Sequence, residues 1–481
     1  MYLGIDLGTS SVKTVLMSEQ QQIVASSSSP LDVQRPADGW SEQDPASWIT
    51  AIENTLSDLH QNHASSMQAV KGIGLSGHMH GATLLDNSDS VIRACILWND
   101  TRSHQEAASL DTNTSRDLCG NILFPGFTAP KLAWVANNEP ELFNKVSKVL
   151  LPKDYARLWL TGEHVSEMSD AAGTGWLDVE KRNWSDELLN ATSMSGDHMP
   201  SLVEGTDVSG QLRQELCTRF GLPNNVVVAG GAGDNAASAC GMGVVAANSA
   251  FLSLGTSGVL FAANAKYQPN AASAVHTFCH AIPNTWHQMG VILAATDALN
   301  WLGNTLGQSP SELSSALTES DTDATNVIFL PYLGGERTPH NDANARGVFL
   351  GLSHTTDAKA MTKAVLQGVA FAFKDSQSAL ATAGTQLQNV FAIGGGSKSN
   401  YWLQILANTL NIPLQVTVDG DYGASLGAAR LGMIAADKAD PLSICTPPSI
   451  ERTIEPEQRY AHAFNDQYER YKRSYLALKG L

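Results

Sequence analysis

Two short turns carry side chains that could meet a phosphate group. Leu7-Gly8-Thr9-Ser10 recurs as Leu254-Gly255-Thr256-Ser257, and each copy lies between two runs of β-type residues. A hairpin of this kind turns backbone N–H groups and hydroxyls outward at its tip, where they attract anions. One such turn alone is common, but its repetition in the same context predicts two related halves that face one ligand.

The two turns differ in charge. Asp6 and Lys13 flank the first turn, whereas the aligned positions around the second are Ser253 and Leu260. If both turns face one nucleotide, the first adds a carboxylate able to hold a metal and an ammonium able to meet phosphate. The second adds only neutral donors. The alternatives are a local Asx-type turn contact for Asp6 and a solvated strand position for Lys13.

Another acidic side chain follows a buried strand. Val226–Ala229 is an apolar run, and Gly230-Gly231-Ala232-Gly233 leads from it to Asp234 at the start of an alanine- and glycine-rich helix. Ligands of open α/β sheets bind at the carboxyl ends of strands, so this carboxylate is placed for general-base chemistry. The alternative role for Asp234 is that of a helix N-cap.

The bulk properties limit the possible partners. A chain of 481 residues exceeds the size at which one hydrophobic core keeps growing, so we expect two domains, 1–245 and 246–481. The formal charge of −17 argues against nucleic acid and against an anionic membrane, since both require a basic face. The six cysteines form no C-x-x-C pair, which predicts reduced thiols and a cytoplasmic location. No signal peptide and no apolar run of roughly 20 residues is found.

Hydrophobic periodicity predicts an α/β fold, in which strands alternate with amphipathic helices. The predicted strands are two strands joined by a turn within 2–17, then 21–26, 70–75, 82–85, 95–97, 226–229, the two arms of a hairpin over 251–262, 390–393 and 414–418. The predicted helices are 46–59, 130–137, 154–160, 358–380, 400–410 and 424–435, with a turn between 418 and 424. A final helix presents one aromatic face, which we expect to pack in the core: Tyr460, Phe464, Tyr468, Tyr471 and Tyr475.

An ordered set of motifs resembles the FGGY family of carbohydrate kinases, members of the actin, hexokinase and Hsp70 superfamily. The set runs along most of the chain: Gly4-Ile5-Asp6-Leu7-Gly8-Thr9-Ser10, Trp40-Ser41-Glu42-Gln43-Asp44-Pro45, Met79-His80-Gly81-Ala82, Trp98-Asn99-Asp100, Pro125-Gly126-Phe127-Thr128-Ala129-Pro130-Lys131, Leu151-Pro152-Lys153-Asp154-Tyr155, Gly233-Asp234-Asn235-Ala236-Ala237, Gly255-Thr256-Ser257, Gly335-Glu336-Arg337-Thr338-Pro339 and Gly394-Gly395-Gly396. The resemblance implies two ribonuclease-H-like domains, each a mixed sheet flanked by helices, with ATP and a sugar in the cleft between them.

The resemblance also implies roles for single residues. Asp234 would be the catalytic base and would contact the sugar, and Asp6 would hold Mg²⁺ and share in catalysis. The residues expected to contact ATP come from both halves: Thr9, Ser10, Lys13, Gly255, Thr256, Gly395, Gly396 and Asn400, the last beside adenine. The competing interpretation of Gly394-Gly395-Gly396 is a plain tight turn.

The sugar site implied by the resemblance contains Met79, His80 and Trp98. His80 can exchange hydrogen bonds with hydroxyls, and Trp98 could form a wall for the carbon skeleton or be a structural core residue. His78 and His80 lack a carboxylate or cysteine at ligand spacing, so we do not expect zinc there. Asn99, Asp100 and Arg102 receive no role.

The function expected from this resemblance is ATP-dependent phosphorylation of a sugar. The Met79-His80 pair favours D-xylulose as the acceptor, in xylose catabolism, with L-ribulose, L-xylulose, a polyol or glycerol as alternatives. The partners are then a small sugar and ATP, and family members often form homodimers. An Hsp70-like or actin-like ATPase would leave the sugar-site motifs without a role, and a silent sugar sensor would leave Asp6 and Asp234 without one.

Overall fold

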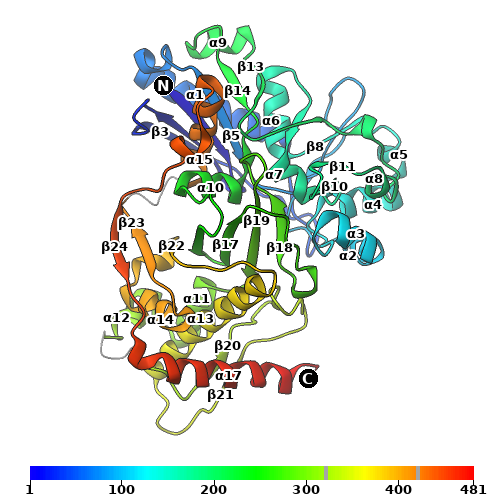
Figure 1. The fold of residues 1–481 in the computed structure, drawn as a ribbon. Coiled ribbons are helices and arrows are strands. Elements are labelled where there is room, and N and C mark those ends of the chain that lie inside the picture. The colour runs from blue at the N-terminus through cyan, green and yellow to red at the C-terminus, as the bar shows by residue number, and fades with distance from the viewer. Residues whose placement is uncertain (319–322, 419–422, 481) are drawn as a thin grey trace.

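The computed structural model describes residues 1–318, 323–418 and 423–480. Two seven-stranded sheets form its framework, one in each half of the chain, and helices cover their faces (Figure 1). The turn predicted after Val418 falls on residues 419–422, outside the described part. The α/β class and the two mixed sheets expected from the sequence are confirmed.

The first sheet has the strand order β13-β14-β5-β1-β2-β3, with β15 paired to β5. Neighbours β1, β2 and β3 are antiparallel, whereas β5 runs parallel to both β1 and β14. The strands are β1 (Tyr2–Leu7), β2 (Ser11–Met17), β3 (Ile23–Pro30), β5 (Gly72–Gly77), β13 (Val208–Gln211), β14 (Val227–Ala229) and β15 (Ala232–Gly233).

The second sheet repeats this path with one added edge strand. Its order is β18-β19-β17-β16-β22-β23-β24, in which β16 lies antiparallel to β17 and parallel to β22, as β1 does to β2 and β5. Its strands are β16 (Ala250–Leu254), β17 (Gly258–Asn264), β18 (His276–Cys279), β19 (Trp286–Ile292), β22 (Val390–Ile393), β23 (Leu414–Thr417) and β24 (Ile450–Ile454). The repeated turn therefore marks a repeated topology.

In the described part of the chain, five two-stranded ribbons and the helices complete the fold. The ribbons are β4 (Glu42–Gln43) with β7 (Cys95–Ile96), β6 (Thr83–Leu85) with β8 (Lys148–Leu150), β9 (Val165–Glu167) with β12 (Ser201–Val203), β10 (Leu177–Asp178) with β11 (Asn183–Trp184), and β20 (Ile328–Leu330) with β21 (Val348–Leu350). The helices are α1 (Pro45–Met67), α2 (His104–Leu110), α3 (Asn113–Cys119), α4 (Thr128–Asn138), α5 (Pro140–Phe143), α6 (Pro152–Thr161), α7 (Met168–Ala171), α8 (Asp186–Asn190), α9 (Gln214–Phe220), α10 (Asp234–Met242), α11 (Thr296–Leu306), α12 (Pro310–Ser315), α13 (Ala358–Thr382), α14 (Asn400–Leu410), α15 (Gly423–Asp437), α16 (Pro441–Ile444) and α17 (Ala461–Leu478).

Helices α1 and α15 cover opposite faces of the first sheet. Alternate residues of β1 point to opposite sides, so Leu3 and Ile5 pack with the buried stripe of α1, while Gly4 faces α15. Helix α1 begins with Asp44 as its N-cap and runs beyond the predicted residue 59 to Met67. The sequence predicts an apolar stripe of Trp48, Ile49, Ile52, Leu56 and Leu59 on this helix, and all of these residues are buried except Ile49, which is partly exposed.

Helix α15 belongs to the second half of the chain but packs on the first sheet, beside α10 (Figure 1). The contact is so close that a Cβ atom on Gly74 of β5 would lie 1.7 Å from the carbonyl oxygen of Ala428. A Cβ on Gly427 would likewise lie 1.8 Å from the Ala237 oxygen in α10. Because these glycines have no side chain, the backbone of a helix from the second half can pack directly against strands and a helix of the first half.

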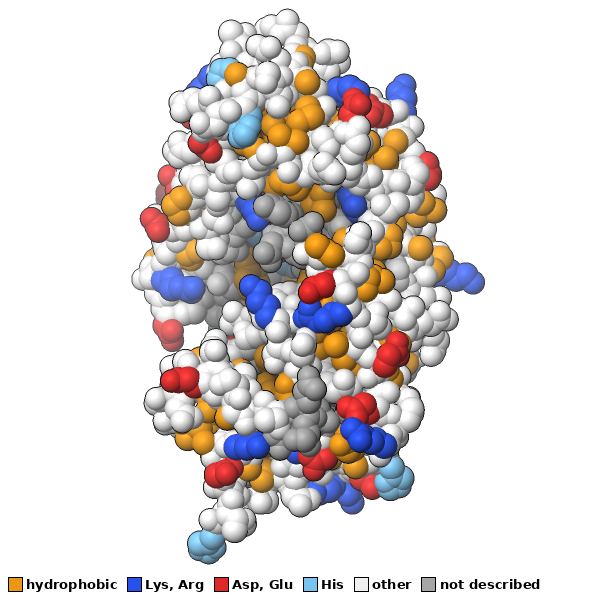
Figure 2. All heavy atoms as spheres, turned by 90° about the vertical axis from the view of Figure 1, so that its left-hand side faces the viewer, with side chains coloured by type: hydrophobic (Ala, Val, Ile, Leu, Met, Phe, Trp, Pro, Cys, Tyr) orange, Lys and Arg blue, Asp and Glu red, His pale blue; other side chains and the backbone are white. Residues whose placement is uncertain are grey.

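The aromatic face of α17 packs in the core, as predicted. Phe464, Tyr468, Tyr471 and Tyr475 are buried, and Tyr460 is partly buried against the same cluster. All six cysteines are free thiols with buried side chains. In the described ranges, no helix is both long and apolar enough to cross a membrane. From the left-hand side of Figure 1, the surface shows a hollow at mid-height with lysine and arginine side chains beside it (Figure 2).

Candidate active site

The two acidic residues singled out by the sequence lie at neighbouring strand ends. In the register of the sheet, Ser76 of β5 pairs with Asp6 of β1 on one side and with Ala232 of β15 on the other. Asp234 follows β15 directly. Since adjacent strands are about 4.8 Å apart, the two acidic residues start from backbone positions roughly 10 Å apart at one edge of the sheet.

The Asp234 carboxyl is set up as a proton acceptor. Asp234 is the first residue of α10, with Gly233 at the N-cap position, so the alternative N-cap role does not apply. Burial and the nearby negative charge of Asp6 raise the pKa of Asp234 to about 6. Hydrogen bonds from the Asn235 backbone N–H (2.7 Å) and side-chain amide (2.9 Å) act in the opposite direction. A carboxyl with such a pKa is largely ionised at neutral pH and is a stronger base than an exposed aspartate.

Asp6 is held by the strand next to it. The Ser76 hydroxyl donates to Asp6 Oδ1 at 2.8 Å, which replaces the Asx-type turn contact considered as an alternative. Burial raises the pKa of Asp6, while Ser76 and the charge of Lys13 lower it. Lys13 lies opposite Asp6 in the β1–β2 hairpin. A buried carboxylate at a strand end is suited to a divalent cation that carries most of its own water.

Two side chains from other segments donate hydrogen bonds to the first phosphate-sized turn. The Gln43 side-chain amide donates to the Thr9 carbonyl at 2.7 Å, and the Trp98 indole N–H donates to Thr9 Oγ1 at 3.0 Å. Ser10 is exposed at the tip of the turn. Trp98 is 47% exposed, which excludes a buried structural role for its ring and leaves one face open beside the turn.

The second turn is one residue shorter than the first. Leu7 pairs with Val12 across the first turn, whereas Leu254 pairs with Gly258 across the second. As a consequence Ser253 lies opposite Val259, so the residue that replaces Lys13 in space is Val259 and not the sequence-aligned Leu260. The extra residue of the first turn shifts the register, which sequence alignment cannot show.

The second turn is anchored on α11. The Gly255 carbonyl accepts from the Thr296 backbone N–H (2.9 Å) and hydroxyl (2.8 Å), and the Thr256 carbonyl accepts from the Ala295 N–H at 2.8 Å. Thr256 and Ser257 are exposed at the tip. Both turns therefore leave their tips accessible to a phosphate chain.

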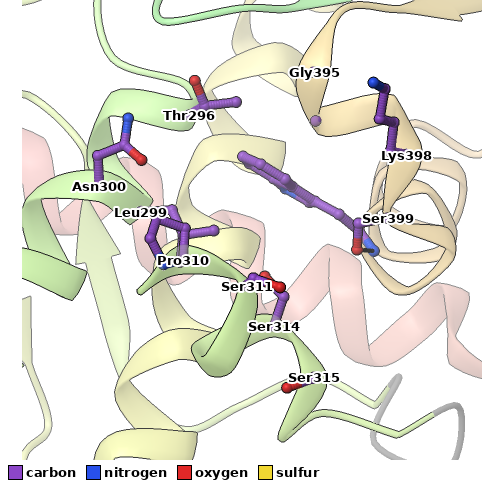
Figure 3. Close-up of a pocket in the computed structure, with 12 residues that line it drawn as sticks. Thr296, Leu299, Asn300, Pro310, Ser311, Ser314, Ser315, Gly395, Lys398 and Ser399 are labelled. Atoms are coloured by element: carbon purple, nitrogen blue, oxygen red, sulfur yellow. Dashed lines mark hydrogen bonds between the residues drawn. The ribbon is translucent and has the colours of Figure 1, made fainter. Parts of the chain in front are cut away.

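A cavity of about 480 Å³ adjoins the second turn. Figure 3 shows Gly395, Lys398 and Ser399 on one side of it, facing residues of α11 and α12. Its wall consists of Thr296, Leu299, Asn300, Pro310, Ser311, Ser314, Ser315, Gly395, Gly396, Lys398, Ser399 and Trp402. Asn400, predicted beside adenine, is exposed at the start of α14 and is not part of this wall.

The glycines before α14 meet the second turn closely. Gly394 has a φ of +88°, and a Cβ on Gly396 would lie 2.8 Å from Leu254 Cβ. Gly394-Gly395-Gly396 therefore forms a tight turn and also contributes to the cavity wall, so the two interpretations of this motif are compatible. The contribution of α11 and α12 to that wall had no local signal in the sequence.

His80 carries a neutral ring. Its Nδ1 lies 2.5 Å from the Gly173 carbonyl, which can only accept, so Nδ1 carries the proton and Nε2 is an acceptor. Burial lowers the pKa of His80 to about 3. The ring stacks on Phe127 with 4.7 Å between centroids, and Met79 beside it is 6% exposed.

The second half adds two residues near His80 that received no role from the sequence. Arg337 Nη1 lies 3.2 Å from His276 Nε2, and the Arg337 guanidinium lies 4.7 Å from the ring centre of Phe124. The charge of Arg337 contributes to the lowered pKa of His80. In the sequence, Arg337 was marked only as part of the motif Gly335-Glu336-Arg337-Thr338-Pro339, and no role was predicted for its side chain.

Two of the three residues left without a role, Asp100 and Arg102, belong to a structural ion network. Arg102 donates to both oxygens of Asp100 and contacts Glu42 at 2.6 Å, and Asp100 accepts from the Ser41 N–H. This joins the segment after β7 to the one that carries Gln43. Within the described ranges, no group of three or more His, Cys, Asp or Glu residues is arranged to hold a metal ion.

The fold and the site define a two-domain α/β kinase of the actin and hexokinase type. The N-terminal domain of the FGGY family of carbohydrate kinases matches residues 1–241, and the C-terminal domain of the same family matches residues 250–436. The chain belongs to this family. Such a kinase uses ATP as its phosphoryl donor.

The chain is similar over its full length to proteins with more specific names. It is 48% identical to the xylulose kinase of Escherichia coli K12, with 99% of each chain covered. A crystal structure of a xyloylose kinase from Brucella ovis has a TM-score of 0.98 and 57% identity, with 99% of both chains covered. The xylulose kinase structure from Rhodospirillum rubrum has a TM-score of 0.92 and 27% identity, covering 99% of this chain and 98% of that one.

Proposed function

We propose that this chain transfers the γ-phosphoryl group of ATP to the C5 hydroxyl of D-xylulose, a step of xylose catabolism. The observation that carries the proposal is the pair of carboxylates, Asp6 and Asp234, at the ends of strands on either side of β5. The full-length similarity to xylulose kinases supports the choice of sugar.

Asp234 is the proposed base. Phosphoryl transfer needs the acceptor hydroxyl in line with the γ-phosphorus and a group that takes the hydroxyl proton. With a pKa raised to about 6, Asp234 is mainly ionised at neutral pH and able to take that proton as the sugar oxygen attacks.

Asp6 is the proposed Mg²⁺ site. Its oxygen donors suit this ion, and its buried carboxylate, with only Ser76 and Lys13 to offset the raised pKa, gains from a further positive charge. Bound there, Mg²⁺ would supply positive charge against the triphosphate. Thr9, Ser10 and Lys13 would meet the phosphates from one side, and Gly255 with Thr256 from the other.

The proposed sugar contacts lie on the first half. The Nε2 lone pair of His80 can accept from a sugar hydroxyl, and the exposed ring of Trp98 offers an apolar wall for C–H groups. Met79 lies against Gly233, the residue before Asp234, so the sugar wall and the base are neighbours. Gly395 and Gly396 would line the adenosine side, and Asn400 stays a prediction.

Replacing the base tests the mechanism. Asp234→Ala should lower D-xylulose-dependent ADP release by about 10³-fold or more, while ATP binding measured by calorimetry stays within a few-fold. Asp186→Ala is the matched control, since Asp186 is also the first residue of a helix, α8, and is exposed far from both turns. Turnover of Asp234→Ala close to that of the parent would overturn the proposed base.

A substrate panel tests the sugar. Steady-state ADP release with D-xylulose, L-ribulose, L-xylulose and glycerol should give the highest kcat/KM for D-xylulose, and a higher value for another acceptor would reassign the substrate. The homodimer, the cytoplasmic location and the domain limits at residue 245 stay predictions.

A further inference from the structure

A short buried segment lies between the turn that carries Asp234 and the sugar-side residue His80. The segment comprises β9, α7 and the 3₁₀ turn Ala172–Thr174. Its side chains Glu167 and Ser169 are fully buried. Buried polar groups are costly unless they are bonded, so their partners show what the segment holds in place.

The hydrogen-bond partners of Ser169 define the orientation of its hydroxyl group. Its single proton points to the Glu167 carboxylate, whose two oxygens each lie 2.9 Å from Ser169 Oγ. The lone pairs of Oγ are then available, and one accepts the Gly233 backbone N–H at 3.1 Å. This N–H belongs to the residue immediately before Asp234.

Glu167 is itself fixed. Its carboxylate also accepts the backbone N–H groups of Ser169 (2.7 Å) and Asp170 (2.8 Å), and the ammonium of Lys153 lies 3.7 Å away. Both Lys153 and Glu167 are 0% exposed. Burial raises the pKa of Glu167, and the charge of Lys153 and the two backbone N–H groups oppose this rise and favour the ionised carboxylate that accepts the Ser169 proton.

Arg157 holds the opposite end of the same turn. Its guanidinium donates to the carbonyl oxygens of Ala229 at 2.6 Å and Gly230 at 2.5 Å. In between, Gly231 has a φ of +75°, and a Cβ there would lie 2.2 Å from the Leu75 oxygen. The turn before Asp234 is thus bonded at both ends and packed in its middle.

The far end of the segment reaches the sugar side. The carbonyl of Gly173 accepts the Nδ1 proton of His80 at 2.5 Å, and a Cβ on Gly173 would lie 2.7 Å from His80 Cε1. Only three residues lie between Ser169 and Gly173 in the sequence. A displacement of this segment would therefore alter the position of His80 relative to Asp234.

We propose that Ser169 is a positioning residue: through the Gly233 N–H it sets the placement of Asp234, and through its own segment it ties that placement to His80. The inference rests on the proposed function, since Asp234 and His80 are the proposed base and sugar contact. A displacement of ~1 Å at a reacting group can cost about 10²-fold in rate.

The test is Ser169→Ala, with Ser166→Ala as the matched control. Ser166 lies in β9 and is also buried, but among the described residues its hydroxyl has no hydrogen-bond partner. For Ser169→Ala we expect kcat to fall at least 10-fold, with KM for ATP within twofold and a shifted acid limb of the kcat/KM profile. Ser166→Ala should keep kcat within twofold.

A second variant keeps the test decisive if Ser169→Ala does not fold. The sulfur of Ser169→Cys is larger than the oxygen it replaces and is only a weak hydrogen-bond acceptor, so kcat of this variant should lie several-fold below that of the parent. A folded Ala variant, or failing that a Cys variant, with parental kcat and an unmoved acid limb would overturn the positioning role. In that case an inactive Asp234→Ala would leave the proposed base standing, whereas an active one would overturn Asp234 as the base; phosphorylation of D-xylulose by the parent protein tests the proposed function separately.

Discussion

The pKa of the Asp234 carboxyl depends on its burial and on two neighbours, Asp6 and Asn235, which have opposing effects. Burial and the charge of Asp6 favour its protonated form, while two hydrogen bonds from Asn235 favour the ionised form. The balance leaves a pKa of about 6. The proton affinity of this group is therefore adjustable through Asn235 without removing either carboxylate.

Removing the Asn235 side chain should raise the pKa of Asp234. Asn235→Ala deletes the amide that donates to the ionised carboxylate at 2.9 Å, so the protonated form persists to higher pH. The acid limb of the kcat/KM profile should move upward by about 0.5 to 1 pH unit, since hydrogen bonds to charged groups contribute ~1.5 kcal/mol and one pKa unit is 1.36 kcal/mol.

The control for this shift is Asn62→Ala. Asn62 Nδ2 donates to Asp58 Oδ1 at 2.8 Å on the exposed side of α1, so it is the same amide–carboxylate pair away from the cleft. Its removal should leave the pH profile in place. An acid limb of Asn235→Ala that stays fixed or moves to lower pH would contradict the proton balance derived for Asp234.

At the scale of elements, β1 and β5 depend on a helix that comes from the other half of the chain. Gly4, Gly72 and Gly74 place backbone, not side chains, against α15. Asp6 and Ser76 follow two residues after Gly4 and Gly74 on the same strands. The spacing between sheet and helix therefore bears directly on the strand ends that form the site.

Gly74→Ala should destabilise the fold strongly. The added methyl would lie 1.7 Å from the Ala428 carbonyl oxygen and 2.6 Å from its carbon, so sheet and helix must separate. Overpacking of this kind costs about 1 to 3 kcal/mol or more, which thermal unfolding would show as a lowered Tm.

Gly196→Ala provides the comparison for the glycine substitution. Nothing lies within 4 Å of a Cβ at this exposed position, so its Tm should match that of the parent. Equal Tm values for Gly74→Ala and Gly196→Ala would show that α15 is free to move away from the sheet.

On the scale of the whole molecule, the two halves are joined at more than one place. Helix α15 returns to the first sheet, and the buried cluster around Phe251, Phe261 and Phe278 continues into Met79 and Leu123 of the first half. The tips of both phosphate-sized turns stay exposed, as does Trp98. A γ-phosphate in contact with both halves would be shielded from water only if the halves approach each other.

Saturation with D-xylulose and a non-hydrolysable ATP analogue should therefore reduce the radius of gyration. Closure around both substrates excludes water, which would otherwise compete as the phosphoryl acceptor. Small-angle X-ray scattering gives the measurement, and the same analogue with D-glucose is the control. An unchanged radius with both ligands bound would contradict closure.

Local sequence patterns determined the parts of the site that depend on neighbouring residues. The turn chemistry around Thr9 and Thr256, the strand before Asp234 and the helix 400–410 follow from glycine placement and hydrophobic periodicity, which act over a few residues. The ordered motifs added the family, which the matches to both FGGY domains confirm.

Only the tertiary structure decided which distant groups meet. The Ser76 bond to Asp6, the Gln43 bond to Thr9 and the Ser169 bond to Gly233 join residues 70, 34 and 64 positions apart. None has a periodic signature, because a buried polar group is specified by the partner that satisfies it and not by its neighbours in sequence. The chain thus encodes its reactive groups locally, while sheet register and close helix contacts fix the distances between them.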